Sequence, residues 1–164
     1  MQVELASNFR NAHRIAQVLR RIGGPGSPQY APEGFVPIWH EASSVSGAAG
    51  VVDAELERII EEEQRSSRSV CVATLHSRVR DALREQCGLV RWEDRGEGGV
   101  VCENVHRLKG LEFDTVILVG IDPKDADRTT LLYIGVSRAI SELIVVGVSE
   151  VADRLGLSYH QDQN

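Results

Sequence analysis

The 164-residue sequence lacks the phosphate-binding loop G-x-x-x-x-G-K-[ST] with which many nucleotide hydrolases hold their substrate. Its glycine-rich stretch, residues 23–27, has no Lys-Ser/Thr pair and follows an expected helix instead of a strand. No expected strand ends in paired Asp and Glu residues that would hold Mg²⁺. These absences exclude a chain that hydrolyses a nucleotide on its own.

Long apolar runs and targeting signals are missing as well. No run approaches the roughly 18 residues that are needed to cross a membrane. The N-terminus lacks the basic and apolar regions of a signal peptide. We therefore expect a cytoplasmic protein.

Cysteine and lysine are scarce. The three cysteines, Cys71, Cys87 and Cys102, have no metal-ligand spacing, which indicates reduced, buried thiols and no metal site. Only Lys109 and Lys124 are lysine, so arginine supplies nearly all of the positive charge. The formal net charge of -6 disfavours strong, autonomous binding to nucleic acid.

Helical and strand-like segments alternate along the chain, which is the pattern of an α/β domain with a mostly parallel sheet. We expect a single domain over residues 1–164, with a frayed tail at 160–164. The expected helices cover residues 11–22, 53–64, 77–87, 131–139 and 150–155. The expected strands cover residues 3–5, 35–39, 70–75, 89–92, 100–105, 114–119 and 143–148.

Two segments before the central strands carry further expectations. Residues 43–50 are rich in small side chains and are expected to form a flexible linker. Asp53 is the expected N-cap of the helix that follows. The acidic residues at 57–62 are expected to form a solvated face of that helix instead of a metal site.

Three cationic side chains come from segments that are far apart in the sequence: Arg10, Lys109 and Arg138. Phosphoryl transfer concentrates negative charge on phosphate oxygens, and positioned cations stabilise that charge. Arginine suits this task because its planar guanidinium binds two oxygens together. We expect these groups to converge on one sheet edge and to complete a nucleotide site whose other half belongs to another domain.

The most informative stretch is 104–114, N-V-H-R-L-K-G-L-E-F-D, just ahead of the strongest expected strand. It resembles motif V of the UvrD/Rep-type superfamily 1 helicases, roughly T-x-H-x-x-K-G-L-E-F. The resemblance implies that Glu112 binds the ribose of ATP, that Lys109 lies near the phosphates and that Gly110 allows a sharp turn. It also implies that Asn104 contacts the single strand, and that His106 contacts the strand or couples it to the nucleotide site. A structural histidine and a capping glutamate are the alternatives.

Two further segments are similar to motifs of the same helicases. Residues 8–10, N-F-R, resemble motif IV, which implies that Phe9 stacks on adenine and Arg10 contacts the γ-phosphate; a helix cap with a core phenylalanine is the alternative. Residues 131–139, L-L-Y-I-G-V-S-R-A, resemble motif VI, L-x-Y-V-[AG]-x-[ST]-R-A. This resemblance implies that Arg138 is a second arginine finger.

The segment after the expected strand at 70–75 occupies the place of a family segment that touches the nucleic-acid backbone. Thr74, His76 and Arg78 are therefore candidate nucleic-acid contacts, with a plain strand-to-helix turn as the alternative. The sequence departs from the family pattern at Asn104, where Thr is usual, and at 128–130, where Glu-Arg-Arg is usual. The large helical insertion of the bigger helicases is absent, which indicates a compact branch or a loss.

The resemblance implies the second RecA-like domain of a helicase, a three-layer α/β domain without its own phosphate loop. ATP would be shared with a missing N-terminal RecA-like domain, which would also hold Mg²⁺. Single-stranded DNA is the expected track, with RNA left open, and we expect the isolated domain to be monomeric, inactive and unattached to a membrane. A non-catalytic helicase-like module for protein or nucleic-acid binding is the second interpretation. A third, a nucleotide-binding domain of an unrelated enzyme, would need a glycine-rich strand-to-helix turn that is lacking.

Overall fold

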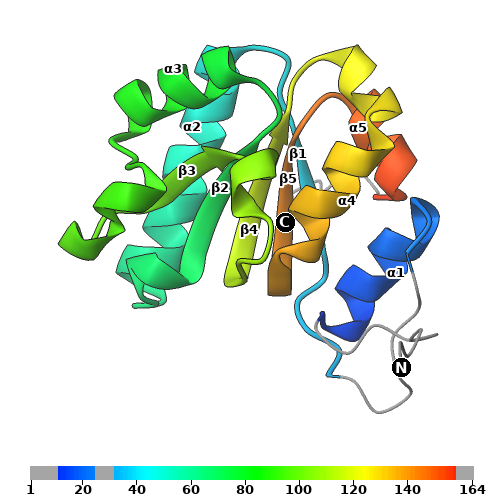
Figure 1. The fold of residues 1–164 in the computed structure, drawn as a ribbon, viewed down its shortest axis with the longest axis horizontal. Helices are drawn as coiled ribbons and strands as arrows, with labels where there is room; N and C mark the ends of the chain where they lie inside the picture. Colours follow the sequence, from blue (N-terminus) through cyan, green and yellow to red (C-terminus); the bar gives the residue numbers. More distant parts are fainter. Residues whose placement is uncertain (1–10, 25–31, 158–164) are drawn as a thin grey trace.

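A sheet of five strands forms the centre of the molecule. The computed structural model describes residues 11–24 and 32–157, and Figure 1 shows their arrangement. The strand order is β1-β5-β4-β2-β3, and each neighbouring pair is parallel. The strands are β1 (Ile38–Glu41), β2 (Val70–Thr74), β3 (Val101–Asn104), β4 (Phe113–Gly120) and β5 (Ala139–Gly147).

Helices cover both faces of this sheet (Figure 1). One face carries α1 (His13–Arg21), α4 (Thr129–Ser137) and α5 (Ser149–Leu155). The other carries α2 (Val45–Leu56) and α3 (Ser77–Cys87). The three-layer, parallel α/β fold that the sequence predicted is therefore confirmed.

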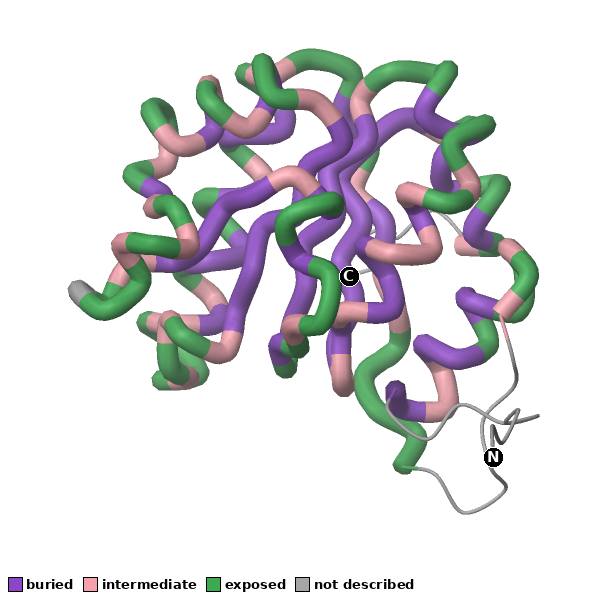
Figure 2. Tube along the Cα trace, in the orientation of Figure 1, coloured by how far each residue is buried: buried purple, intermediate pink, exposed green. Residues whose placement is uncertain are grey.

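The central strands are apolar on both faces because both faces are covered. In β4, Val116 and Leu118 join the core under α1, α4 and α5. Ile117 and Val119 join the core under α2 and α3. Figure 2 shows this burial along the middle strands, with exposed residues confined mostly to helices and turns.

The expected linker at 43–50 is wrong, because α2 begins there. The Ser44 hydroxyl accepts a hydrogen bond from the Gly47 amide at 3.0 Å and caps the helix, so Asp53 lies inside the helix and is not its N-cap. Ala48 and Ala49 are buried against the sheet. The small side chains that indicated flexibility instead allow the helix to pack closely.

Most other expected elements are present. The helices expected at 11–22, 77–87, 131–139 and 150–155 form α1, α3, α4 and α5, and α2 continues into a π-helical segment, Glu57–Glu62, whose glutamates are exposed as predicted. The strand expected at 89–92 is wrong, since only a single bridge joins Val90 to Val101. Strand β1 starts at Ile38 because Pro37 has no backbone N–H to donate. The expected strand at 3–5 and the expected frayed tail lie outside the described residues.

All three cysteines are free thiols, as the sequence predicted. Burial raises the pKa of Cys87 and Cys102 to about 12, so both stay protonated near neutral pH. Within residues 11–24 and 32–157 there is no helix of the length and apolarity that spanning a membrane requires.

The carboxyl ends of β4 and β5 approach so closely that Gly147 has no room for a side chain. A Cβ at this position would overlap with the Gly120 carbonyl oxygen. We predict that Gly147→Ala lowers the free energy of unfolding by about 3 kcal/mol, measured by urea denaturation. Gly50→Ala in α2, where a Cβ meets nothing within 4 Å, is the matched control and should be neutral or stabilising. Equal effects of the two substitutions would contradict this interpretation.

Candidate nucleotide and nucleic-acid sites

The short loop between β3 and β4 carries four of the candidate residues predicted from the sequence: His106, Lys109, Gly110 and Glu112. It begins with a 3₁₀ turn, Val105–Leu108, whose two end residues are buried. His106 and Lys109 are exposed. Gly110 has a φ of +83°, a left-handed conformation that suits glycine and agrees with the predicted sharp turn. The apolar residues therefore anchor the loop while its polar residues face outward.

This loop leads to the amino end of β4. Open α/β sheets usually bind ligands outside the carboxyl ends of their strands. Lys109, Gly110 and Glu112 instead lie just before β4 begins at Phe113. The candidate nucleotide residues are therefore at the opposite edge of the sheet from the one that this general rule favours.

Arg138 lies at the same edge, where α4 ends and β5 begins. Its carbonyl oxygen accepts a hydrogen bond from the Phe113 amide at 2.9 Å, so it lies beside the residue that follows Glu112. Its half-buried side chain folds back on α4: Nε donates to the Ile134 carbonyl at 3.2 Å and Nη2 donates to the Ser137 hydroxyl at 2.9 Å.

A glycine lets α4 lie close to β4 and to the loop. A Cβ on Gly135 would lie 2.9 Å from Leu118 Cδ1 and 3.1 Å from Val105 Cγ1. Larger side chains would push the helix away from both. Gly135 therefore helps to fix the end of α4, and with it Arg138, against the start of β4.

Asn11, the first residue that the structure describes, is hydrogen-bonded to the residues on either side of Arg138. Its side-chain amide donates to the carbonyls of Ser137, at 3.1 Å, and Ala139. Phe9 and Arg10 lie outside the described residues. The structure thus brings Asn11, Arg138 and the Lys109–Glu112 loop to one sheet edge.

Asn104 belongs to a second group of candidates, at the carboxyl ends of β2 and β3. The Thr74 hydroxyl donates to Asn104 Oδ1 at 2.6 Å, and the Asn104 amide donates to the Ser77 hydroxyl at 3.0 Å. Thr74 is fully buried, so in this structure it orients Asn104 and does not reach the surface.

His76 and Arg78 follow β2 and line a cavity of about 550 Å³ together with Ser43, Val79, Ile121, Asp122 and Pro123. Arg78 is exposed. His76 Nε2 lies 2.7 Å from Oδ1 of the buried Asp125. The two groups of candidates lie at opposite ends of the strands, roughly 25 Å apart for an eight-residue strand such as β4.

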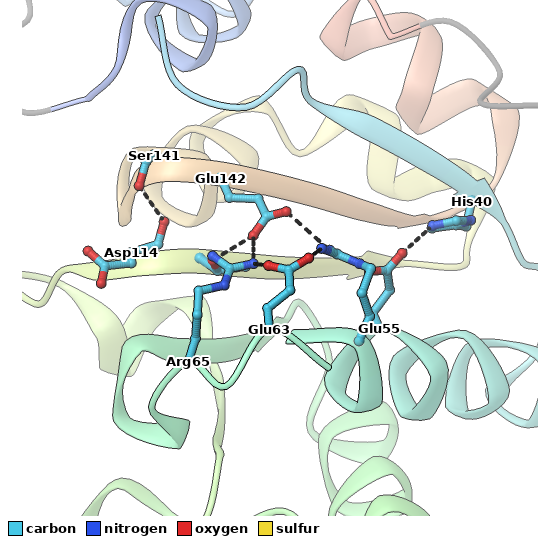
Figure 3. Close-up of polar contacts among 9 residues, drawn as sticks. His40, Glu55, Glu63, Arg65, Asp114, Ser141 and Glu142 are labelled. Atoms are coloured by element: carbon cyan, nitrogen blue, oxygen red, sulfur yellow. Dashed lines mark hydrogen bonds and ion pairs between the residues drawn. The ribbon is translucent and has the colours of Figure 1, made fainter. Parts of the chain in front are cut away.

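The sequence did not predict the buried ion-pair network that Figure 3 shows between α2 and the strands. Glu142, at 5% side-chain exposure, is paired with Arg58 at 3.1 Å and with Arg65 at 2.7 Å. It also accepts a hydrogen bond from the Thr115 hydroxyl, its cross-strand neighbour, at 2.8 Å. Glu63 bridges the same two arginines. The network braces β4 and β5 a few residues beyond Glu112 and Arg138.

The network continues through Glu55 to His40 on the edge strand β1 (Figure 3). Burial would raise the pKa of Glu55, but hydrogen bonds from His40 and Arg58 outweigh it and hold this pKa below its ordinary value. Arg58 is desolvated too, yet its pairing with Glu55 raises its pKa. Both groups are therefore charged near neutral pH.

Only one sequence signal could have revealed this network. Glu142 is a charged residue at the start of the apolar run L-I-V-V, and a buried carboxylate needs a cationic partner. The arginines that pair with it lie 84 and 77 residues away, so their identity depends on the fold.

Comparisons with known proteins agree with this architecture. Residues 99–146 match the family model of the UvrD-like helicase C-terminal domain. This range contains the segments at 104–114 and 131–139. The resemblance of these two segments to UvrD-type helicase motifs is therefore confirmed. Residues 8–10 and 70–78 lie outside the match.

A similar solved structure is the C-terminal domain of a possible DNA helicase from Lactobacillus plantarum WCFS1. It shares 22% sequence identity with the present chain, and the two superimpose with a TM-score of 0.71 over 94% of this chain and 96% of that one. The chain therefore has the fold of a helicase C-terminal domain. No curated protein sequence matches it.

Removing the central carboxylate should destabilise the sheet. We predict that Glu142→Gln lowers the free energy of unfolding by about 3 kcal/mol, because Arg58 and Arg65 lose the buried charge between them. Urea denaturation at neutral pH measures this. Glu61→Gln, on the exposed side of the same helical segment, should change stability by less than about 0.5 kcal/mol. A cost no larger than that of the control would show that Glu142 is not braced as described.

Acid should remove the contribution of Glu55. Because its pKa is lowered in the folded state, the stabilisation is complete above the ordinary carboxyl pKa and is lost as pH falls through the folded-state value. The difference in unfolding free energy between the wild type and Glu55→Gln should therefore be large at pH 7 and shrink below about pH 4. Urea denaturation as a function of pH measures it. A difference that grows in acid would contradict the assignment.

Proposed function

We propose that this chain is the second motor domain of an ATP-dependent DNA helicase or translocase. One observation carries the proposal: Arg138, the loop of Lys109 and Glu112, and Asn11 next to Arg10 gather at one sheet edge. They do so although more than a hundred residues separate Asn11 from Arg138. The family match over residues 99–146 and the helicase-domain fold support the same conclusion.

The amino-end edge fits half of an ATP site. Lys109 is exposed and has no hydrogen-bond or ion-pair partner among the described residues, so its ammonium group is available to a phosphate. Arg138 supplies a guanidinium and Glu112 a carboxylate suited to ribose hydroxyls. Phe9 and Arg10 would contribute an adenine platform and a further cation.

The other half of the site would come from an N-terminal RecA-like domain. The sequence has no phosphate loop, and residues 11–24 and 32–157 contain no cluster of three His, Cys, Asp or Glu side chains for a metal ion. The partner domain would therefore bind the triphosphate and Mg²⁺. Bound ATP supplies the phosphate whose transfer to water releases the energy for movement.

Arg138 would have to change partners when the two domains close. Its guanidinium now donates to the Ile134 carbonyl and the Ser137 hydroxyl at the end of α4. Exchanging these neutral acceptors for phosphate oxygens replaces weaker hydrogen bonds with charge-assisted ones. Such a difference in contacts between two states is what allows nucleotide binding to drive domain motion.

The opposite edge would form part of the single-strand track. Arg78 is exposed at this edge, and Asn104 is held in place by Thr74 and Ser77. His106, which is exposed in the loop that follows Asn104, would contact the strand from there. Backbone contacts of this kind position a nucleic acid without reading its sequence. Nucleotide and strand would thus bind at opposite ends of the same parallel strands.

Loss of Arg138 should stop turnover in the complete protein. We predict that Arg138→Ala lowers the rate of ATP hydrolysis by about 10³-fold or more, while nucleotide affinity changes little, because an arginine finger acts mainly on the transition state. Arg154→Ala is the control and should leave turnover intact, because Arg154 of α5 forms only an exposed pair with Asp127. Unchanged hydrolysis in Arg138→Ala would refute the assignment.

A non-catalytic helicase-like module is the second candidate. The net charge of -6 favours this second candidate, since domains that bind nucleic acid on their own usually carry basic surfaces. The sequence of the coding region upstream of residue 1 distinguishes the two candidate functions. An in-frame domain with a phosphate loop supports the motor domain, and its absence supports the non-catalytic module.

A further inference from the structure

A buried carboxylate lies behind the cavity at the carboxyl edge of the sheet. Asp125 belongs to the 3₁₀ turn Pro123–Asp127, between β4 and α4, and its side chain is only 1% exposed. A carboxylate in such surroundings loses its hydration, so each of its oxygens needs a partner. The partners of the two oxygens therefore indicate what Asp125 does.

One oxygen serves the turn itself. Asp125 Oδ2 accepts a hydrogen bond from the Asp122 amide at 3.2 Å, while Asp122 caps the same turn through the Lys124 amide at 2.9 Å. This reciprocal capping accounts for Oδ2. It does not account for Oδ1.

The other oxygen holds His76, which is 49 residues earlier in the sequence and follows a different strand. Nε2 of His76 lies 2.7 Å from Asp125 Oδ1. The imidazole is about one-third exposed and lies at the wall of the 550 Å³ cavity, with Arg78 two residues further on. Because Nε2 faces the buried carboxylate, Nδ1 is the ring nitrogen that is left for another partner.

We infer that Asp125 is a positioning residue: it holds the His76 imidazole at this cavity, where His76 and Arg78 contact the phosphodiester backbone of a single-stranded nucleic acid. This inference rests on the proposed function. A histidine whose ring is fixed by a carboxylate loses less side-chain freedom when it binds a ligand. In its protonated form the ring donates from Nε2 to Asp125 and from Nδ1 to a phosphate oxygen.

The charges around the cavity define where the phosphate lies. Asp122 also lines it and would repel an anion on that side. Arg128 Nε lies 3.5 Å from Asp125 Oδ1 and offsets the buried charge from the side of α4. The phosphate is therefore expected against His76 and Arg78, away from Asp122.

A double-mutant cycle in the complete protein tests this role. The readout is the concentration of a single-stranded oligothymidylate that half-maximally stimulates ATP hydrolysis. His76→Asn and Asp125→Asn should each raise it about tenfold or more, from the loss of one hydrogen bond to a charged partner. Asp125→Asn should add less than twofold in the His76→Asn background, because it acts through His76.

Two controls separate positioning from stability. Arg78 contacts the strand independently of Asp125. The effect of Arg78→Gln on the half-maximal concentration should therefore multiply with that of Asp125→Asn. Asp127 is an exposed carboxylate on the same turn, and Asp127→Asn should leave the half-maximal concentration unchanged. A purely structural role of Asp125 would give the same factor with and without His76, and that result would overturn the inference.

Other outcomes are equally decisive. If hydrolysis by the wild type does not respond to the oligothymidylate, the proposed function fails and this inference fails with it. If the response is present but the cycle is multiplicative, only the inference fails. Should Asp125→Asn not fold, ¹⁵N spectra of the wild-type His76 ring replace it: the oligothymidylate should shift Nδ1 and leave Nε2 bonded, and an unperturbed ring would overturn the inference.

Discussion

The pairing of β4 with β5 is the constraint on which the rest of the structure depends. At the amino end it joins the Phe113 amide to the Arg138 carbonyl and so sets the start of one strand beside the end of α4. At the carboxyl end Gly147 lies against the Gly120 carbonyl, where a Cβ on residue 147 would not fit. Both candidate edges are therefore fixed by one pair of strands, and a shift in their register would displace them together.

Charge pairing supports this contact from the side. Glu142 and Thr115 face each other across the two strands. Arg58 reaches them from the π-helical segment that continues α2, and Arg65 reaches them from the loop that follows this segment. A hydrophobic residue at 142 could fill the same space. The ion pairs are directional, however, and they join the strands to the end of α2 in one arrangement. We attribute to them the alignment of β4 and β5 just beyond the candidate nucleotide residues.

The sequence predicted what depends on local pattern and missed what depends on distant contacts. The apolar runs of β2, β4 and β5 are local signals, and each was found. The same holds for the motif-like segments around Lys109 and Arg138. The start of α2 was missed because small residues suit both linkers and tightly packed helices. His76–Asp125 and the Glu142 network join residues whose proximity only the fold creates.

The central claim is that the amino-end edge completes an ATP site on a neighbouring domain. A structure of the complete protein with a non-hydrolysable ATP analogue and Mg²⁺ tests it most directly. The account predicts that the Arg138 guanidinium and the Lys109 ammonium lie within hydrogen-bonding distance of phosphate oxygens, with Glu112 at the ribose. A nucleotide bound elsewhere, with Arg138 still folded on α4 and facing no phosphate, would contradict it.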